Sequence, residues 1–192
     1  MVTRSTLKTL SFSDAMRHVN QGAAFVDLRD VASYLDAHIH SSLSLQYETG
    51  PGFQSRARDC IPLEIPLVLL AHEGTDMVNA ASSLRGRGFN VLGLVPDALQ
   101  ESSKWYGTPA STETYRGPPP RRSLVLDVSD PGTSGVGEAT RIPIEQLWGR
   151  AGEVSDEPRV VVASGYGVRA ALAVGILERF GVKETVVWET RG

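Results

Sequence analysis

Residues 159–180, with the sequence RVVVASGYGVRAALAVGILERF, hold the side chains best arranged for chemistry. Three consecutive valines predict a short buried strand, and the alanine-rich apolar run after the loop predicts a helix. A loop that leads from a strand into a helix directs backbone N–H groups and the positive end of the helix dipole to one place. We therefore expect an anion-binding loop with Ser164 at the position of a nucleophile. The loop consists of Ser164, Gly165, Tyr166, Gly167, Val168 and Arg169.

Two roles are open to Arg169 at the start of the expected helix. Its guanidinium and the loop N–H groups would bind sulfate, thiosulfate or phosphate. Alternatively, it caps the loop or pairs with Asp127 as part of the scaffold. Ser164 would act as an acyl or phosphoryl nucleophile only beside a general base, and the second half of the chain contains no histidine. We therefore do not expect Ser–His catalysis.

Cys60 is the single cysteine of the chain, which excludes an internal disulfide and a cysteine-rich zinc site. It falls in residues 48–65, which lack a clear periodicity and predict a loop with one helix at most. Arg56 and Arg58 lie close to it in the sequence and would favour its thiolate. Cys60 is therefore a candidate reactive thiol.

His38 and His40 are spaced like a pair of metal ligands, but no third ligand follows at a suitable spacing, so we expect no metal site.

The elements that must position these residues occur twice. Residues 24–30 (AFVDLRD) and 124–130 (LVLDVSD) share an apolar run that ends in aspartate. Each half then repeats a strand, a loop, a helix and a further strand, and Gly88 or Gly181 ends the helix as a C-cap glycine would. The strand–helix alternation predicts an α/β fold in which mainly parallel sheets are flanked by helices.

The repeat also suggests domain boundaries. We expect a first domain at residues 1–110, a proline-rich linker at 111–122 and an abbreviated second domain at 123–192. Three consecutive prolines in the sequence GPPPRR predict that the linker is an extended spacer.

The amino-acid composition limits the classes of function that the protein could have. The chain has 192 residues, 41% hydrophobic content and a formal net charge of −3. No run of basic residues with interleaved aromatics points to nucleic acid, and no apolar run approaches the length of a membrane span. The N-terminus shows no signal peptide. We therefore expect a cytoplasmic protein that uses no cofactor and contacts neither nucleic acid nor membrane.

Several segments resemble the rhodanese family, and together they cover most of the chain. The first half carries VDLRDVASYLDAHIHSSLSL at residues 26–45 and NVLGLVPDALQESSKWYGTP at residues 90–109. The second half carries LVLDVSD, RIPIEQL and SGYGVRAA. The first half departs from the family turn Gly-His-Ile-Pro-Gly-Ala at Ala37, His40, Ser41 and Ser42. It is also similar to rhodanese modules attached to metallo-β-lactamase-fold persulfide dioxygenases, although the metal-binding run of that hydrolase is missing here.

The resemblance implies two rhodanese-like domains whose active loop would read Cys-x-x-Gly-x-Arg. The first loop has Ala71, Gly74 and Asp76 at those three positions; counting from the preceding proline instead would place His72 first. The second loop has Ser164 in place of the cysteine, together with the matching glycine and arginine. Neither copy has the cysteine that carries the persulfide in this family.

The leading hypothesis is a catalytically degenerate tandem rhodanese-like protein. It would bind a protein partner, a small oxyanion or a sulfur compound in sulfur or persulfide metabolism. The alternative is an active thiosulfate or persulfide sulfurtransferase, in which Ser164 replaces a native cysteine or Cys60 accepts the sulfur. A phosphatase with a related fold fits less well, because such enzymes also need a cysteine and use a longer loop.

Overall fold

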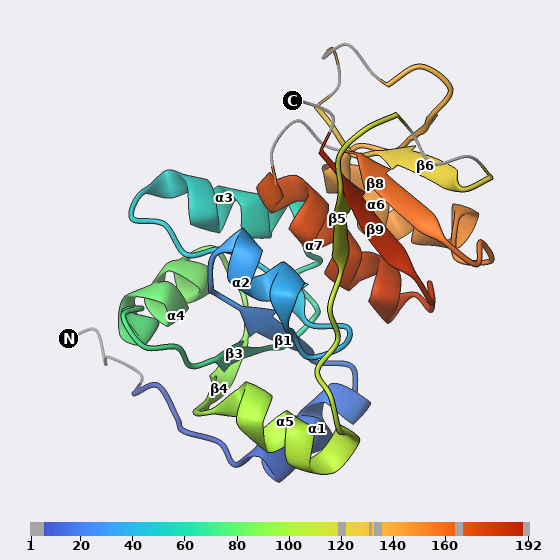
Figure 1. Ribbon diagram of the computed structural model, residues 1–192. Coiled ribbons are helices and arrows are strands. Elements are labelled where there is room, and N and C mark those ends of the chain that lie inside the picture. Colours follow the sequence, from blue (N-terminus) through green and yellow to red (C-terminus); the bar gives the residue numbers. More distant parts are fainter. Residues whose placement is uncertain (1–5, 119–121, 131, 133–135, 164–166, 190–192) are drawn as a thin grey trace.

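The structure is a computed structural model that describes residues 6–118, 122–130, 132, 136–163 and 167–189. Figure 1 shows two β-sheets, one built mainly from each half of the chain, with helices packed against them. Every strand pair in both sheets is parallel. The predicted α/β fold of parallel sheets flanked by helices is therefore confirmed.

The first half forms a four-stranded sheet in the order β2-β1-β3-β4. Parallel neighbours must be joined by crossovers, and the intervening helices provide them. In chain order the elements are α1 (Phe12–Asn20), β1 (Ala24–Asp27), α2 (Val31–Asp36), β2 (Leu43–Ser44), α3 (Pro51–Cys60), β3 (Leu67–Leu70), α4 (Met77–Gly86), β4 (Val91–Val95) and α5 (Ala98–Tyr106).

The second half forms a five-stranded sheet in the order β5-β9-β8-β6-β7. If β5 is set aside, this is the order of the first sheet, with β6, β7, β8 and β9 in the places of β1, β2, β3 and β4. The elements are β5 (Glu113–Tyr115), β6 (Leu124–Asp127), β7 (Thr140–Arg141), α6 (Ile144–Arg150), a 3₁₀ helix (Ala151–Glu153), β8 (Val160–Ala163), α7 (Gly167–Arg179) and β9 (Thr185–Trp188).

Local sequence signals set the ends of the main helices. Ser11 caps α1 by accepting a hydrogen bond from the backbone N–H of Asp14. The predicted C-terminal glycines Gly88 and Gly181 have φ angles of 96° and 94°, in the left-handed region that glycine adopts at least cost. Both helix stops are confirmed.

One segment differs from the sequence-based expectation, and a second was left open by it. Residues 113–115, inside the expected spacer, form β5 and pair with β9 at the edge of the second sheet. An extended segment already has the backbone conformation of a strand, so docking at a sheet edge satisfies its polar groups at little further cost. Residues 51–60 form α3, the one helix that the expectation for residues 48–65 allowed, and it begins with Pro51 at a position where proline is well tolerated. The domain boundaries themselves stay a prediction.

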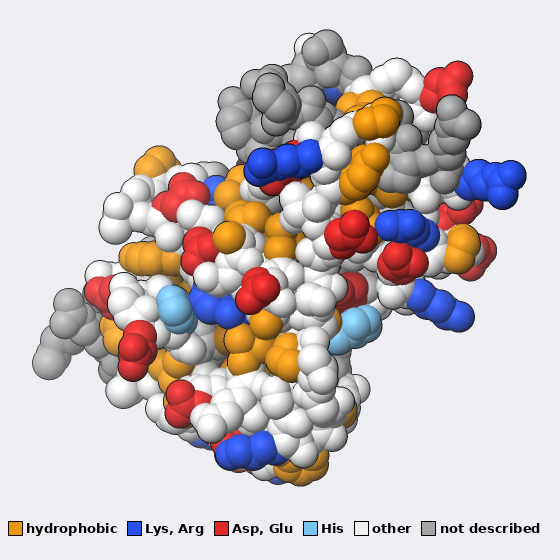
Figure 2. Space-filling view, in the orientation of Figure 1, with side chains coloured by type: hydrophobic (Ala, Val, Ile, Leu, Met, Phe, Trp, Pro, Cys, Tyr) orange, Lys and Arg blue, Asp and Glu red, His pale blue; other side chains and the backbone are white. Residues whose placement is uncertain are grey.

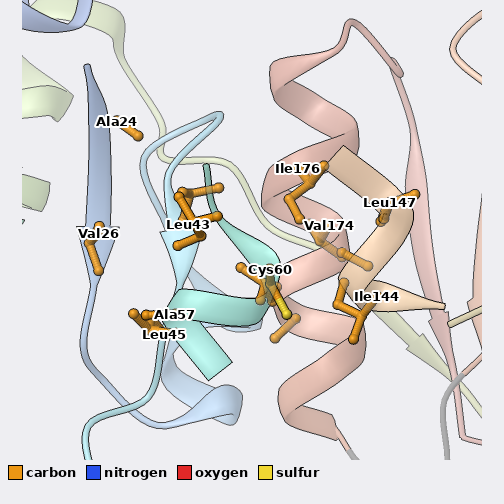
Figure 3. Packing of buried hydrophobic residues seen from close by; sticks show 14 of the residues in the cluster. Ala24, Val26, Leu43, Leu45, Ala57, Cys60, Ile144, Leu147, Val174 and Ile176 are labelled. Atoms are coloured by element: carbon orange, nitrogen blue, oxygen red, sulfur yellow. The ribbon is translucent and has the colours of Figure 1, made fainter. Parts of the chain in front are cut away.

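Helix α7 joins the two halves. It contacts β2 of the first sheet as well as β8 and β9 of its own, and its residues 170–178 are all buried. A Cβ added to Gly175 would lie 2.1 Å from the carbonyl oxygen of Ser42, so only glycine permits this approach. Leu43 of β2 belongs to the same hydrophobic cluster as Val174 and Ile176 of α7 (Figure 3). The two halves therefore share one core.

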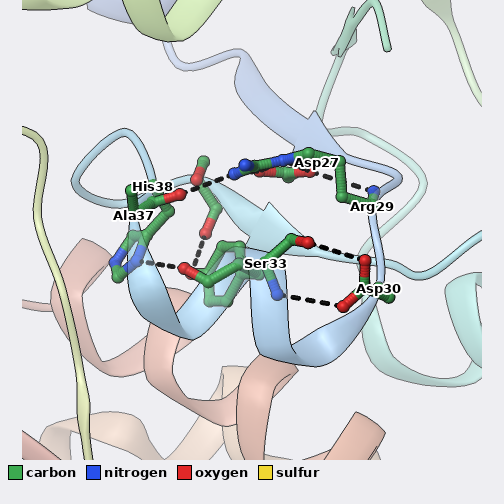
Figure 4. A network of polar contacts seen from close by, with 8 residues as sticks. Asp27, Arg29, Asp30, Ser33, Ala37 and His38 are labelled. Carbon is green, nitrogen blue, oxygen red and sulfur yellow. Dashed lines mark hydrogen bonds and ion pairs between the residues drawn. The ribbon is translucent and has the colours of Figure 1, made fainter. Parts of the chain in front are cut away.

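Asp27, at the carboxyl end of β1, is buried and forms an ion pair of 2.6 Å with Arg29. Arg29 also donates a hydrogen bond of 2.6 Å to the carbonyl of Ala37, so it ties the strand end to the end of α2 (Figure 4). Asp127 has the same place in the second half, where Ser129 stands in the position of the arginine. There, the carboxylate of Asp127 accepts a hydrogen bond of 2.9 Å from the backbone N–H of Ser129.

On the face of the molecule seen in Figure 2, acidic and basic side chains are interspersed rather than gathered by sign. In the described ranges, no helix has the length and apolar content needed to cross a bilayer.

Candidate functional site

The carboxyl ends of parallel strands meet at one edge of each sheet, which is where ligand sites form in folds of this kind. The first such loop follows β3 and runs through Ala71 to α4. Asp76 caps α4, and its carboxylate accepts a hydrogen bond of 3.0 Å from the backbone N–H of Asn79. The N-terminus of α4 thus already holds a negative charge of the protein itself. This arrangement disfavours binding of an external anion.

A cavity of about 330 Å³ opens at this edge of the first sheet. Ala71 lies in its wall beside His72, Asp97 and the ion-paired Asp27 and Arg29. Ala71 has no reactive group, so the position that the resemblance assigns to the nucleophile is chemically inert here. His72, the alternative at that position, is an exposed loop residue.

In the second loop, Ser164, Gly165 and Tyr166 lie outside the described residues. Gly167, Val168 and Arg169 form the first turn of α7.

Arg169 contacts two carboxylates, Asp130 at 2.5 Å and Glu145 at 2.8 Å. The expected pairing with Asp127 is wrong. Asp127 lies at the buried end of β6, where backbone N–H groups bind its carboxylate, while Asp130 and Glu145 lie nearer the surface. Arg169 thus pairs within the scaffold with partners other than Asp127, and its binding of an anion stays a prediction.

The first turn of α7 and the end of α3 line one pocket of about 280 Å³. Arg169 and Cys60, which the sequence presents as unrelated candidates, thus share a site. Helix α6 supplies the third wall. The lining residues are Gly52, Arg56, Asp59, Cys60, Ile144, Glu145, Val168, Arg169 and Leu172.

Cys60 is the last residue of α3, and only 4% of its surface is exposed. In Figure 3 it lies near Ile144 and Leu147 of α6 and Val174 of α7. Burial raises the pKa of the Cys60 thiol from 9.0 to about 12. The carboxylate of Glu145 adds to this shift, and the guanidinium of Arg169 opposes it. Arg56 does lower the pKa of Cys60, as the sequence predicts, but desolvation of the charged form outweighs it, so the thiolate is disfavoured.

The remaining histidine candidates have structural contacts. His38 is buried, and both of its ring nitrogens have partners, the carbonyl of Tyr34 and the carboxylate of Glu178. His40 is exposed and contacts the hydroxyl of Ser41 through Nδ1. Among the described residues, no group of three or more His, Cys, Asp or Glu side chains is arranged to hold a metal ion.

Comparison with known proteins gives one clear sequence match. The chain is 34% identical over 70 residues to a thiosulfate sulfurtransferase, GlpE, of Pseudomonas savastanoi pv. phaseolicola. The match covers 36% of this chain and 62% of that relative. No family model matches the sequence.

Two solved structures align with nearly the whole chain at low identity. A thiosulfate sulfurtransferase from Pseudomonas aeruginosa is 19% identical over 97% of this chain and 38% of its own, with a TM-score of 0.43. SseA from Escherichia coli, a 3-mercaptopyruvate sulfotransferase with the "Rhodanese" fold, is 13% identical over 95% of this chain and 98% of its own, with a TM-score of 0.40.

Sequence reasoning missed the residues that neutralise Arg169 and the third wall of the Cys60 pocket. Glu145 both pairs with Arg169 and lines this pocket, and it lies far from Cys60 in the chain. No local pattern marks a residue whose role depends on the packing of α6 against α3 and α7.

Proposed function

We propose that this protein is a rhodanese-like binding module that does not transfer sulfur through either of its loops. It would bind a small oxyanion, a sulfur compound or a protein partner in sulfur metabolism. One observation carries the proposal: the chain has a single cysteine, and it lies in neither loop. A persulfide forms on a thiolate, which the methyl group of Ala71 and the hydroxyl of Ser164 cannot replace.

The environment of Cys60 supports the same conclusion. A thiol whose pKa is raised to about 12 is protonated at neutral pH and is a poor nucleophile. Cys60 also ends a helix that packs against α6, and it comes earlier in the chain than either loop.

The test is the transfer of sulfur from thiosulfate to cyanide, followed as thiocyanate. The protein and its Cys60→Ala variant should give the same rate, equal to the uncatalysed background. Ser164→Cys and Ala71→Cys restore a thiol to each loop in turn and report whether the rest of each loop is still competent. Thiocyanate formation by the unaltered protein well above background would overturn the proposal.

A second function, sulfur transfer by Cys60 itself, is favoured by the pocket that Cys60 shares with Arg169. The Cys60 thiolate would attack the outer sulfur of thiosulfate. The S–S bond would break, sulfite would leave with its electron pair, and the sulfur would remain as a persulfide until cyanide removed it. This route predicts activity that Cys60→Ala abolishes, together with a mass increase of one sulfur atom on the protein after exposure to thiosulfate.

A further inference from the structure

The imidazole of His38, in the turn after α2, has an oxygen beside each of its ring nitrogens. His38 is buried, with Nδ1 2.9 Å from the carbonyl oxygen of Tyr34 and Nε2 3.0 Å from Oε1 of Glu178. A neutral imidazole has one N–H and one lone pair, so it could donate to only one of these oxygens. The lone pair would then face either a carbonyl or a carboxylate, neither of which can donate. The geometry therefore requires one proton more than a neutral imidazole and a carboxylate hold.

The imidazole is the stronger base of the two groups, so the additional proton belongs on Nε2 of His38. The other oxygen of Glu178 accepts a hydrogen bond of 2.7 Å from the backbone N–H of Ser41. Both oxygens of the carboxylate are thus bound by donors that come from the first half of the chain. A buried carboxylate is strongly destabilising without a cation beside it.

The arginines of the neighbouring segments have acceptors of their own. Arg29 pairs with Asp27 at 2.6 Å, and Arg179, next to Glu178 in the chain, donates to the backbone carbonyls of residues 22 and 23. The cation that compensates Glu178 is therefore the imidazolium. The other ionisable side chains on these segments, Asp36 and His40, are exposed, and residues 110–112, which pair with the backbone of His38, have none.

Tyr34 lies against the imidazole but does not supply the proton. Its ring stacks on that of His38 with the centroids 4.2 Å apart, and its hydroxyl donates a hydrogen bond to the carbonyl of Ser42. Burial, followed by the negative charges of Glu178 and Asp27, raises the pKa of Tyr34 well above its ordinary value. The phenol therefore stays neutral.

We propose that His38 is a buried imidazolium and that its second proton makes the contact between the two halves of the molecule sensitive to pH. While the ring holds both protons, it joins the carboxylate of α7 to the turn after α2. When base in the solvent removes the proton from Nε2, a lone pair faces the carboxylate of Glu178, and the pair keeps one uncompensated negative charge. The contact should then open, because such a charge is costly to bury.

The direction of the pH dependence follows from the number of protons that each state binds. In the unfolded chain an imidazole releases its proton at about pH 6.5 and a glutamic acid at about pH 4.3. Between these values both states hold one proton on the pair, so its stabilisation is fully present. At higher pH the unfolded chain binds fewer protons than the folded protein, so the stabilisation is lost as the pH rises.

The experiment is urea denaturation of the unaltered chain and of Glu178→Gln between about pH 5.5 and 8.5. The amide of the variant can donate to the lone pair of a neutral imidazole and accept from Ser41, so this contact needs no additional proton. Relative to the variant, the folding equilibrium constant of the unaltered chain should fall by up to about tenfold per pH unit above about pH 6.5. Glu157→Gln, which removes the same charge at an exposed position, is the matched control and should behave as the unaltered chain does.

NMR of the chain labelled with ¹⁵N-histidine tests the position of the proton and does not require the variant to fold. His38 is the buried histidine, so its ring N–H groups should exchange slowly with water. At about pH 7 we expect hydrogen on both nitrogens of His38, where a free imidazole would be mostly neutral. A single N–H on His38, or a difference between the unaltered chain and Glu178→Gln that is constant with pH, would overturn the inference. Neither residue lies in a loop that would carry sulfur, so the inference goes beyond the proposed function and does not depend on it.

Discussion

His38 Nε2 lies 3.0 Å from Oε1 of Glu178, and both residues are buried although they come from opposite halves of the chain. The other ring nitrogen of His38 lies 2.9 Å from the carbonyl oxygen of Tyr34, which can only accept, so Nδ1 carries a proton. The second carboxylate oxygen of Glu178 accepts a hydrogen bond of 2.7 Å from the backbone N–H of Ser41. This network fixes α7 to the turn that follows α2.

Removing Glu178 should therefore destabilise the whole molecule. Glu178→Ala leaves the buried Nε2 of His38 and the partly buried N–H of Ser41 without the carboxylate that they contact, and we expect a loss of about 3 kcal/mol in the free energy of unfolding. Glu178→Gln should cost less, since an amide can still accept from Ser41 and donate to His38. Urea denaturation measures both. Glu157→Ala, at an exposed position, is the control; an equal effect of the two alanine substitutions would contradict the role of the network.

Gly175 should tolerate no side chain. The Cβ of Gly175→Ala would lie 2.1 Å from the carbonyl oxygen of Ser42 and 3.0 Å from the hydroxyl of Tyr34. This clash can be relieved only if α7 moves away from the first sheet, and we expect a destabilisation of about 3 kcal/mol or more. Gly86→Ala is the matched control, because Gly86 is also helical and an added Cβ there meets nothing within 4 Å. Thermal denaturation of the two variants should separate them clearly, and similar melting temperatures would refute the close packing of α7.

The raised pKa of Cys60 predicts a dependence of stability on pH. The thiol ionises near pH 9.0 in the unfolded chain and near pH 12 in the folded protein. The stability that Cys60 contributes is therefore fully present below pH 9.0 and is lost as the pH rises through 12, by at most about 1.4 kcal/mol per pH unit. The difference in unfolding free energy between the protein and Cys60→Ala should shrink across this range. A constant difference would show that the thiol is not desolvated.

The ion pair of Asp27 and Arg29 should contribute more to stability than the contact of Asp127 with Ser129 at the corresponding place in the second half. Arg29→Met leaves the buried carboxylate of Asp27 without its cation, and we expect a loss of about 3 kcal/mol in the free energy of unfolding, measured in urea. Ser129→Ala, at the corresponding position, keeps the backbone N–H that binds Asp127 and should have little effect. If the two substitutions lower the free energy of unfolding by the same amount, the ion pair is not what holds the end of β1.

The amino-acid sequence by itself determined most of the elements and their repetition. The valines of β8, the N-cap at Ser11 and the glycines after α4 and α7 act through neighbours within a few residues, so local pattern is enough to predict them. The absence of a cysteine from both loops is also a property of the sequence alone, and it carries the proposed function.

Only the tertiary structure decided the environment of each candidate residue. The arginines beside Cys60 in the chain suggest a thiolate, but the packing of α6 against α3 and α7 removes water from the sulfur and reverses the direction of its pKa shift. The same packing places Arg169 against Glu145. Burial and ion pairing depend on contacts between segments far apart in the chain, and for that reason no local pattern in the sequence could predict them.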